Sequence, residues 1–331
     1  MYTAGKHANS GSRILVVRLG AMGDIIHALP AVASLKHSLP GSHLTWLVEP
    51  RWVELLEGNP FVDTITLLRR GSLAGLHQTW KELRVGRFDF AVDFQGLVKS
   101  ALAASAARPE RIYGFHQSQT RERAAALFYS DKFRSEAAHV VDRNLDLAAV
   151  AGAANKVYAF HLPEGRPEGN LPTGEFVLSS PLAGWGSKQW PLDSFRELAR
   201  RLRRDLGMPL VLNLPHGAAA PPIEEAIPHF SGISGLIYAT RAATAVVGVD
   251  SGPLHIAAAV GKPGVAMFGP TDPARNGPYG GSLSILRSPA AATTYKRRAD
   301  VDTSMQHISP VEVLDALRAA LQRRHSTGSL A

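Results

Sequence analysis

The chain contains no cysteine. Disulfide bridges, thiolate zinc sites and cysteine nucleophiles are therefore excluded, and the absence agrees with a reducing compartment. No stretch approaches the roughly 18 consecutive apolar residues that a membrane-spanning helix needs. The polar start, "MYTAGKHANSGS", has no apolar core of the kind found in signal peptides. We therefore expect a cytoplasmic protein that at most binds a membrane from its surface.

Several motifs of catalysis and binding are also missing. The chain has no Walker A loop, no HExxH and no GxSxG, and it has no GxGxxG of the nicotinamide type. Zinc-finger spacing and long blocks of Lys or Arg are absent as well, so nucleic acid is not an expected partner. The "DVD" at 300–302 resembles an Asp-x-Asp metal site, but it lies in a polar segment with no clear strand before it. We treat it as chance and expect no metal.

The chain does have enough residues for two domains. Its 331 residues exceed the roughly 150 residues expected of one domain. Its 36 Lys and Arg against 28 Asp and Glu give a formal net charge of +8. Such a charge favours an anionic partner, for example a phosphate-rich substrate or a membrane surface. A basic surface without a particular partner is the common alternative.

In the first half of the chain, apolar runs typical of buried strands alternate with helical patterns, which favours a parallel sheet with helices on both faces. Strands are predicted within 13–20, 40–50, 62–68, 89–96 and 111–115, and helices at 24–39, 79–88, 97–107 and 139–153.

The pattern stops at 162–174, "LPEGRPEGNLPTG", which is dense in Pro and Gly and is the best linker candidate. It then starts again, with strands predicted at 175–180, 209–214, 244–250 and 263–269, and helices at 192–207, 234–243, 251–261 and 309–324. We therefore predict a disordered leader (1–12), a first domain (13–161), the linker, a second domain (175–325) and a tail (326–331).

Ligands of open parallel sheets bind at the carboxyl ends of the strands, so the loops that follow strands are the informative ones. The first is "RLGAMGDIIHALPA", residues 18–31. Its Asp24 is either an ordinary helix cap, which the residue type slightly favours, or a general base beside a glycine turn. The two alternatives are compatible if the cap leaves part of the carboxylate available.

The second loop is "VVGVDSGPLHIAAAVGKP", residues 246–263, where a strand ends at Asp250. Ser251, Gly252 and Pro253 then begin a helix, whose free N–H groups and dipole make an anion site. His255 follows in the first turn, as a phosphate donor or as a packed side chain. The residues alone leave these alternatives even.

Two further loops carry weaker signals. In "PLAGWGSKQWP", residues 181–191, Lys188 follows small residues and either neutralises a leaving phosphate or is a solvated surface lysine. In "DFQGLVKSAL", residues 93–102, Gln95 and Lys99 follow a strand end and are candidates to bind a polar acceptor.

Together the stretches are more specific than any one of them. "VRLGAMGDIIHALPA", "VDFQGLVKSAL", "KQWP", "VVGVDSGPLHIAAA" and "FGPTDPARNGPYG" occur here in the order found in the bacterial lipopolysaccharide heptosyltransferases, glycosyltransferase family 9. The chain resembles this family from about Arg13 to Arg324. "GDIIHALPA" and "DFQGLVKSAL" are most similar to its heptosyltransferase I members.

The resemblance implies a GT-B fold, with two Rossmann-like domains facing a cleft. The second domain would bind the nucleotide sugar and the first the acceptor. The implied reaction is an inverting, metal-independent transfer of heptose from ADP-L-glycero-D-manno-heptose to the Kdo region of lipid A. It would need no cofactor beyond this donor. We expect a monomer at the anionic cytoplasmic face of the inner membrane.

The resemblance also implies roles for individual residues. Asp24 and Lys188 match catalytic positions of the family. The residues that match donor-binding positions are Gly23, Ser187, Asp250, Ser251, Gly252 and His255, and those that match acceptor-side positions are Gln95, Lys99, His139 and Arg143. Threonines that often precede the family's lysine are replaced here by Ala183 and Gly184.

Other functions on the same architecture stay open from the sequence. They are heptosyltransferase II or another core glycosyltransferase of the family, a nucleotide-sugar epimerase that needs no acceptor, and a catalytically silent protein that binds the nucleotide sugar. The presence of both Asp24 and Lys188 argues against the silent alternative.

Overall fold

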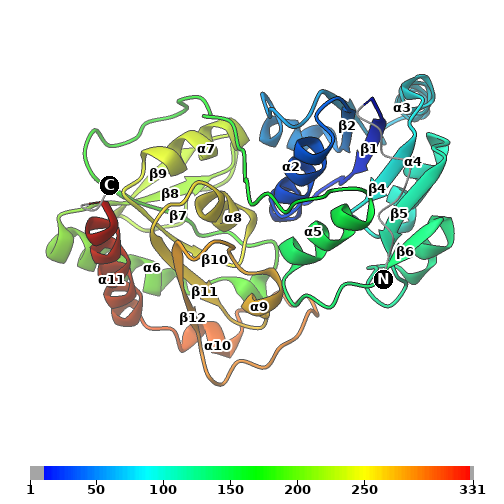
Figure 1. Cartoon of the computed structure of the whole chain (residues 1–331). Helices are drawn as coiled ribbons and strands as arrows, with labels where there is room; N and C mark the ends of the chain where they lie inside the picture. The colour runs from blue at the N-terminus through cyan, green and yellow to red at the C-terminus, as the bar shows by residue number, and fades with distance from the viewer. Residues whose placement is uncertain (1–10, 329–331) are drawn as a thin grey trace. The chain divides into compact units, whose positions relative to one another are not determined.

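The computed structural model describes residues 11–328 (Figure 1). The expected leader lies outside these residues except for Gly11 and Ser12, and so does the end of the expected tail, 329–331. The chain divides into two compact units between Pro163 and Glu164, inside the predicted linker. Each unit is described by itself below.

The first unit is built on a six-stranded sheet in the order β3-β2-β1-β4-β5-β6, with every neighbouring pair parallel. The strands are β1 (Arg13–Val17), β2 (His43–Val48), β3 (Thr64–Leu67), β4 (Phe90–Asp93), β5 (Arg111–Phe115) and β6 (Asp131–Phe133). β1 and β4 are buried along almost their whole length, as expected of central strands covered on both faces.

Helices connect these strands. They are α1 (Met22–Ile26), α2 (Leu29–Ser38), α3 (Leu73–Gly86), α4 (Val98–Ala106) and α5 (Val140–Val150), with the short 3-10 turns η1 (Pro50–Leu55) and η2 (Arg123–Phe128). The single helix predicted at 24–39 is therefore two helices. Pro30 lies in the first turn of α2, where its missing N–H costs no helical hydrogen bond.

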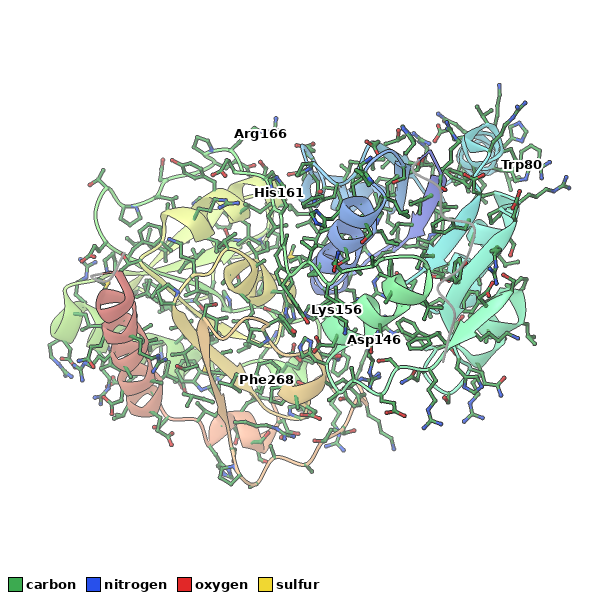
Figure 2. The ribbon with its side chains drawn as sticks, viewed as in Figure 1. Trp80, Asp146, Lys156, His161, Arg166 and Phe268 are labelled. Carbon is green, nitrogen blue, oxygen red and sulfur yellow. The ribbon has the colours of Figure 1, made fainter. Side chains whose placement is uncertain are left out.

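After α5 the chain returns along the first unit. Lys156 Nζ lies 2.7 Å from Asp146 Oδ1 (Figure 2). Farther on, Asn59 Nδ2 donates to the carbonyl oxygen of His161 at 3.0 Å. These bonds tie the segment that leads to the second unit onto the first.

The second unit repeats the plan with a parallel sheet in the order β12-β11-β10-β7-β8-β9. Its strands are β7 (Val177–Ser180), β8 (Leu210–Leu214), β9 (Ala226–Phe230), β10 (Ala245–Val249), β11 (Gly264–Phe268) and β12 (Leu283–Arg287). Its helices are α6 (Leu192–Leu206), α7 (Ile233–Ala242), α8 (Gly252–Ala259), α9 (Pro273–Asn276), α10 (Thr303–Gln306) and α11 (Pro310–Gly328), with the turn η3 (Gly186–Lys188).

The expected linker is hydrogen-bonded to the second unit. Glu168 accepts hydrogen bonds from Gly232 N at 2.7 Å and Gly235 N at 3.1 Å, at the start of α7. This carboxylate therefore caps α7 from outside the helix and holds the segment in place.

In each unit the strand order reverses beside the first strand, at β1 and β4 in the first unit and at β7 and β10 in the second. Such a reversal leaves a crevice at the carboxyl ends of the two strands, where doubly wound sheets bind ligands. The predicted α/β class with two doubly wound parallel sheets is confirmed. The loops after these four strands carry most of the candidate site residues.

Candidate active site

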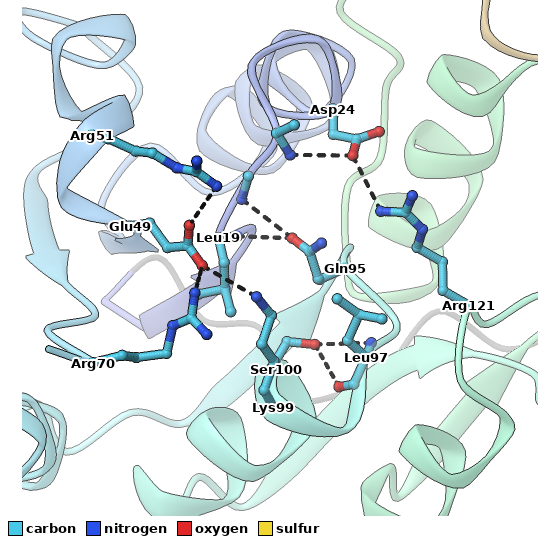
Figure 3. A network of polar contacts seen from close by, with 12 residues as sticks. Leu19, Asp24, Glu49, Arg51, Arg70, Gln95, Leu97, Lys99, Ser100 and Arg121 are labelled. Atoms are coloured by element: carbon cyan, nitrogen blue, oxygen red, sulfur yellow. Dashed lines mark hydrogen bonds and ion pairs between the residues drawn. The ribbon is translucent and has the colours of Figure 1, made fainter. Parts of the chain in front are cut away.

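Asp24 lies in the first turn of α1, just after the glycine turn that follows β1. Its Oδ1 pairs with Arg18 Nη2 at 2.7 Å, and its Oδ2 accepts from Ala21 N at 3.2 Å. Arg121 Nη1 approaches Oδ2 at 3.6 Å (Figure 3). The side chain is 31% exposed. The helix-cap alternative is wrong in its position, because the N-cap residue is Ala21 and Asp24 is the third helical residue, although its carboxylate does accept from the N-cap backbone. The carboxylate also keeps a solvent-accessible side.

Arg18, which the sequence did not single out, holds this carboxylate. Its side chain is buried, and Nη1 donates to the carbonyl oxygen of Phe94 beyond the end of β4. Burial lowers the pKa of Arg18 from its ordinary value, and the charge of Asp24 acts in the opposite direction. Arg18 therefore links the ends of β1 and β4 and fixes one oxygen of Asp24.

Gln95 spans the same reversal point from the other side. Its Oε1 accepts from Leu19 N at 3.0 Å and from Gly20 N at 3.4 Å (Figure 3). At Gly20 a Cβ would lie 2.5 Å from Nε1 of Trp52, so only glycine lets the turn pack here. The carbonyl of Gln95 thus holds the glycine turn in front of Asp24.

The carboxylate of Asp93 holds Gln95 in place by a backbone hydrogen bond. It is fully buried and accepts from Gln95 N at 2.8 Å, from Ser100 Oγ at 2.8 Å and from Tyr129 Oη at 2.7 Å. Burial raises the pKa of Asp93, and the hydrogen bonds from Tyr129 and Ser100 oppose the rise. This carboxylate is a structural anchor and not an exposed catalytic group.

Lys99 belongs to a cationic cluster around one carboxylate, Glu49. Lys99 Nζ lies 3.2 Å from Oε1 of Glu49, Arg51 Nη2 lies 3.1 Å from Oε2, and Arg70 also pairs with Oε1 (Figure 3). Burial acts to raise the pKa of Glu49, but these cations, led by Lys99, outweigh it and lower the pKa. Three cations against one carboxylate leave this cluster with a net positive charge.

The cluster opens into a pocket of about 660 Å³. Its lining includes Glu49, Arg51, Arg69, Arg70, Ser72, Gly75 and Gln78, so it is basic and reaches the start of α3. Because β3 is parallel to its neighbours, this pocket lies after the carboxyl end of the sheet, on the same edge as Asp24.

His139 and Arg143 organise the beginning of α5. His139 is the N-cap residue, its Nδ1 accepts from Val141 N at 3.1 Å, and its ring meets His27 edge-on at 5.5 Å. Arg143 Nε donates to the carbonyl oxygen of Ala137 at 2.8 Å. These contacts assign both residues a structural role; an acceptor contact stays a prediction.

In the second unit, an ion pair bridges the reversal point. Lys188 Nζ, in η3 after β7, lies 2.5 Å from Oδ2 of Asp250 at the end of β10. Their side chains are 15% and 10% exposed. Thr271, in the loop after β11, donates to the same Asp250 oxygen at 2.6 Å. Thr271 is a contact that the sequence analysis missed.

Ser251, Gly252 and His255 lie where predicted, at the start of α8. Ser251 is the N-cap residue, but its hydroxyl makes no capping bond. Within the described part of the chain, the buried Oγ atoms of Ser251 and Ser187 have no hydrogen-bond partner. Two buried hydroxyls beside a helix N-terminus and a lysine suit the oxygens of a bound anion. Gly23, the other predicted donor residue, lies in α1 of the first unit.

A basic segment, residues 296–299, packs directly against the turn η3. Ser187 N donates to the carbonyl oxygen of Arg298 at 3.2 Å. A Cβ on Gly186 would lie 1.5 Å from the carbonyl oxygen of Ala299, so no side chain fits there. Lys188 Nζ and the Arg297 guanidinium both lie over the Trp185 ring, at 4.2 Å and 5.5 Å from its centroid.

Among residues 11–328, no group of three His, Asp or Glu side chains is placed to hold a metal ion. Asp302 of the "DVD" is the N-cap of α10 and accepts from Ser304 N at 3.0 Å. None of the helices in this range is both long and apolar enough to cross a membrane.

Two Rossmann-like units with polar residues at both reversal points have the architecture of the GT-B class of glycosyltransferases. A family model described as glycosyltransferase family 9 (heptosyltransferase) matches residues 76–306, and the chain belongs to this family. The resemblance inferred from the motifs is therefore confirmed.

Proteins of similar sequence and structure support this family assignment. Lipopolysaccharide heptosyltransferase 1 of Escherichia coli K12 is 29% identical, with 84% of this chain and 94% of the relative covered. The protein of that name from Pseudomonas aeruginosa PAO1 is 30% identical, with 83% and 84% covered. The structure of E. coli heptosyltransferase WaaC with ADP-2-deoxy-2-fluoro heptose is 25% identical, has a TM-score of 0.74, and is matched over 93% of this chain and 99% of that one. The E. coli heptosyltransferase II structure supports the fold. It is 21% identical, has a TM-score of 0.76, and is matched over 95% of this chain and 99% of that one.

Proposed function

We propose that this glycosyltransferase moves heptose from ADP-L-glycero-D-manno-heptose to the Kdo region of lipid A. The single observation that carries the proposal is the Lys188–Asp250 pair at the reversal point of the second unit, beside the N-terminus of α8 and two unpartnered hydroxyls. The choice of sugar and pathway is supported by relatives named lipopolysaccharide heptosyltransferase 1 and by the similar WaaC structure, which holds ADP-2-deoxy-2-fluoro heptose.

The second unit would bind the donor. Backbone N–H groups of α8, which begins at Gly252, and the Ser251 and Ser187 hydroxyls supply hydrogen bonds to the diphosphate. Lys188 supplies the positive charge, and Asp250 holds its ammonium group in place. His255, buried in the first turn of α8, completes this donor set.

The first unit would bind the acceptor. The basic pocket beside Lys99 suits the carboxylates and phosphates of a Kdo-bearing lipid A, because its cations outnumber its acids. Gln95 keeps the glycine turn and hence Asp24 in position. His139 and Arg143 would act on the acceptor side through the start of α5.

The proposed chemistry is a direct displacement. An acceptor hydroxyl oxygen attacks the anomeric carbon, the bond from this carbon to the diphosphate oxygen breaks, and ADP leaves with the electron pair. Asp24 takes the hydroxyl proton with the part of its carboxylate that is not paired with Arg18. One displacement inverts the anomeric configuration. Lys188 and the α8 terminus stabilise the departing diphosphate, which is the role that a metal plays elsewhere.

The test is ADP release from ADP-heptose by the purified protein, with and without a Kdo-lipid A acceptor. Acceptor-dependent release is expected, and it is retained in a chelator. Asp24→Asn is expected to lose about 10²–10⁴-fold in turnover while ADP affinity, measured by calorimetry, stays unchanged. Asp193→Asn, at an 89% exposed carboxylate on α6, is the matched control and keeps wild-type turnover. Release without acceptor, or full turnover by Asp24→Asn, would contradict the proposal.

The product's anomeric configuration, determined by NMR, tests inversion separately. A cytoplasmic location and a monomeric state remain part of the same proposal.

A further inference from the structure

In the second unit a stretch of irregular chain, residues 294–299, crosses the end of the sheet as a strap that includes the basic segment 296–299. At one end of the strap, Thr294 N donates to the carbonyl oxygen of Pro270, just after β11, at 2.7 Å. Near the other end, the carbonyl oxygen of Arg298 accepts from the backbone N–H of η3, the turn that follows β7. The strap therefore joins the carboxyl ends of β11 and β7.

The strap passes the end of the strand that lies between these two. β10 is the neighbour of both β11 and β7, and Asp250 follows it directly. Adjacent strands are about 4.8 Å apart, so β11 and β7 are roughly 10 Å apart, a distance that four residues of extended chain can cover. The strap thus borders the place where Lys188 and Asp250 pair, which is the anion site proposed for the donor diphosphate.

The strap carries three consecutive cations, Lys296, Arg297 and Arg298, and all three are exposed. None of them forms an ion pair with another residue in 11–328. Hydrogen bonds from Ser304 lower the pKa of Asp302, and the nearby charge of Arg298 adds to this effect. Arg298 therefore lies near a carboxylate, whereas Arg297 is placed differently.

Arg297 lies over an aromatic ring that it shares with Lys188. Its guanidinium carbon is 5.5 Å from the centroid of the Trp185 ring, and Lys188 Nζ is 4.2 Å from the same centroid. The two positive charges are thus within about 10 Å of each other, close to the screening length of roughly 8 Å in physiological salt. They repel each other, and an anion bound between them removes this repulsion.

The Lys188–Asp250 pair supplies only part of the positive charge that a diphosphate needs. Both side chains are largely buried, their contact is 2.5 Å, and the net charge of the pair is zero. A departing diphosphate carries more than one negative charge, so a further cation would stabilise it. The Ser187 Oγ, buried and without a hydrogen-bond partner in the described part of the chain, belongs to the residue that the strap contacts. This hydroxyl independently indicates an anion at this place.

We propose that Arg297 binds the donor diphosphate as a second cation beside Lys188, and that Trp185 positions its guanidinium group. The inference rests on the proposed function and deepens it, because it names a further residue that takes up the charge of the leaving group. A guanidinium group can donate to two phosphate oxygens at once, which suits a diphosphate.

Calorimetric titration with ADP and with inorganic pyrophosphate tests this assignment. Arg297→Gln is expected to bind both ligands about 10–100-fold more weakly than wild type, because hydrogen bonds to a charged group are lost. Arg297→Lys keeps the charge and should recover part of the affinity. The matched control is Arg298→Gln, at the neighbouring cation beside Asp302, which should bind both ligands within about twofold of wild type.

Trp185 is tested as a positioning residue. Trp185→Leu removes the aromatic face and should weaken pyrophosphate binding by about 2–30-fold. Trp185→Phe keeps an aromatic face and should restore most of the affinity. The melting temperature of each variant shows whether the second unit is folded, and Arg297→Gln, at an exposed side chain, should melt like wild type.

Equal affinity of wild type and Arg297→Gln for pyrophosphate, or an equal loss in Arg298→Gln, would overturn the assignment. Wild type that binds neither ligand would also overturn it. Acceptor-dependent ADP release tests the proposed function separately. Wild type that binds ADP through Arg297 but releases none from ADP-heptose with acceptor would refute the transfer and leave the diphosphate site standing.

Discussion

The positive charge of Lys188 should affect both the stability of the second unit and the turnover of the enzyme, and two variants can separate these effects. Lys188→Met leaves the Asp250 carboxylate, 10% exposed, with the Thr271 hydroxyl at 2.6 Å as its remaining partner among the described residues. Breaking a buried pair in this way costs about 3–5 kcal/mol. At about 2–4 °C per kcal/mol for a unit of this size, the melting temperature of the unit should fall by roughly 6–20 °C.

The double variant Lys188→Met with Asp250→Asn removes both charges. Its melting temperature should return close to wild type, because no unpaired charge stays buried. Its turnover should remain about 10²–10³-fold low, because the leaving diphosphate still lacks its cation. ADP affinity should be weak in both variants.

Calorimetric unfolding of the free protein, ADP titration and acceptor-dependent ADP release are the three assays. Lys156→Met is the matched control: its pair with Asp146 has a 2.7 Å contact, but the lysine side chain is 44% exposed. Solvent screening should keep that loss within about 1 kcal/mol. An unchanged melting temperature in Lys188→Met, or restored turnover in the double variant, would refute the reasoning.

Two predictions concern the first unit. The cations around Glu49, Lys99 foremost, lower its pKa against the effect of burial, so its contribution to stability is present above its ordinary value of 4.5 and is lost as pH falls through the lowered folded value. The unfolding free energy measured by urea denaturation should therefore be higher in wild type than in Glu49→Gln, and this difference should become smaller below pH 4.5. A difference that stays constant with pH would contradict this. Tyr129→Phe removes a 2.7 Å bond to the buried Asp93 and should cost about 1–3 kcal/mol of unfolding free energy, whereas Tyr238→Phe, at a residue that is 37% exposed, should leave it unchanged.

The alternation of apolar runs predicted the central strands because they are buried on both faces and hence continuously apolar. The edge strands β6, β9 and β12 were missed for the converse reason, since each is half-exposed and has no such run. The predicted helix at 79–88 begins earlier, at Leu73, because Ser72 caps it. Local pattern thus predicts what is buried and is weak at the edges.

The site shows the same division. Asp24 and Asp250 could be selected because each follows a strand, where ligands bind. Their partners Arg18 and Thr271 were missed, and so was Glu49. Thr271 meets Asp250, and Glu49 meets Arg70 and Lys99, across more than twenty positions, so no local spacing records these contacts. Arg18 is near Asp24 in the chain, but their ion pair exists only through the geometry of the glycine turn.

The close packing at Gly186 has a consequence for how this family varies. Because a Cβ at this position would overlap the carbonyl oxygen of Ala299, a side chain can appear at 186 only if the segment 296–299 takes another path. The two segments are more than one hundred residues apart in the chain. Homologues are therefore expected to change the two segments together. Loss of the glycine at position 186 should accompany an insertion or deletion in the segment 296–299.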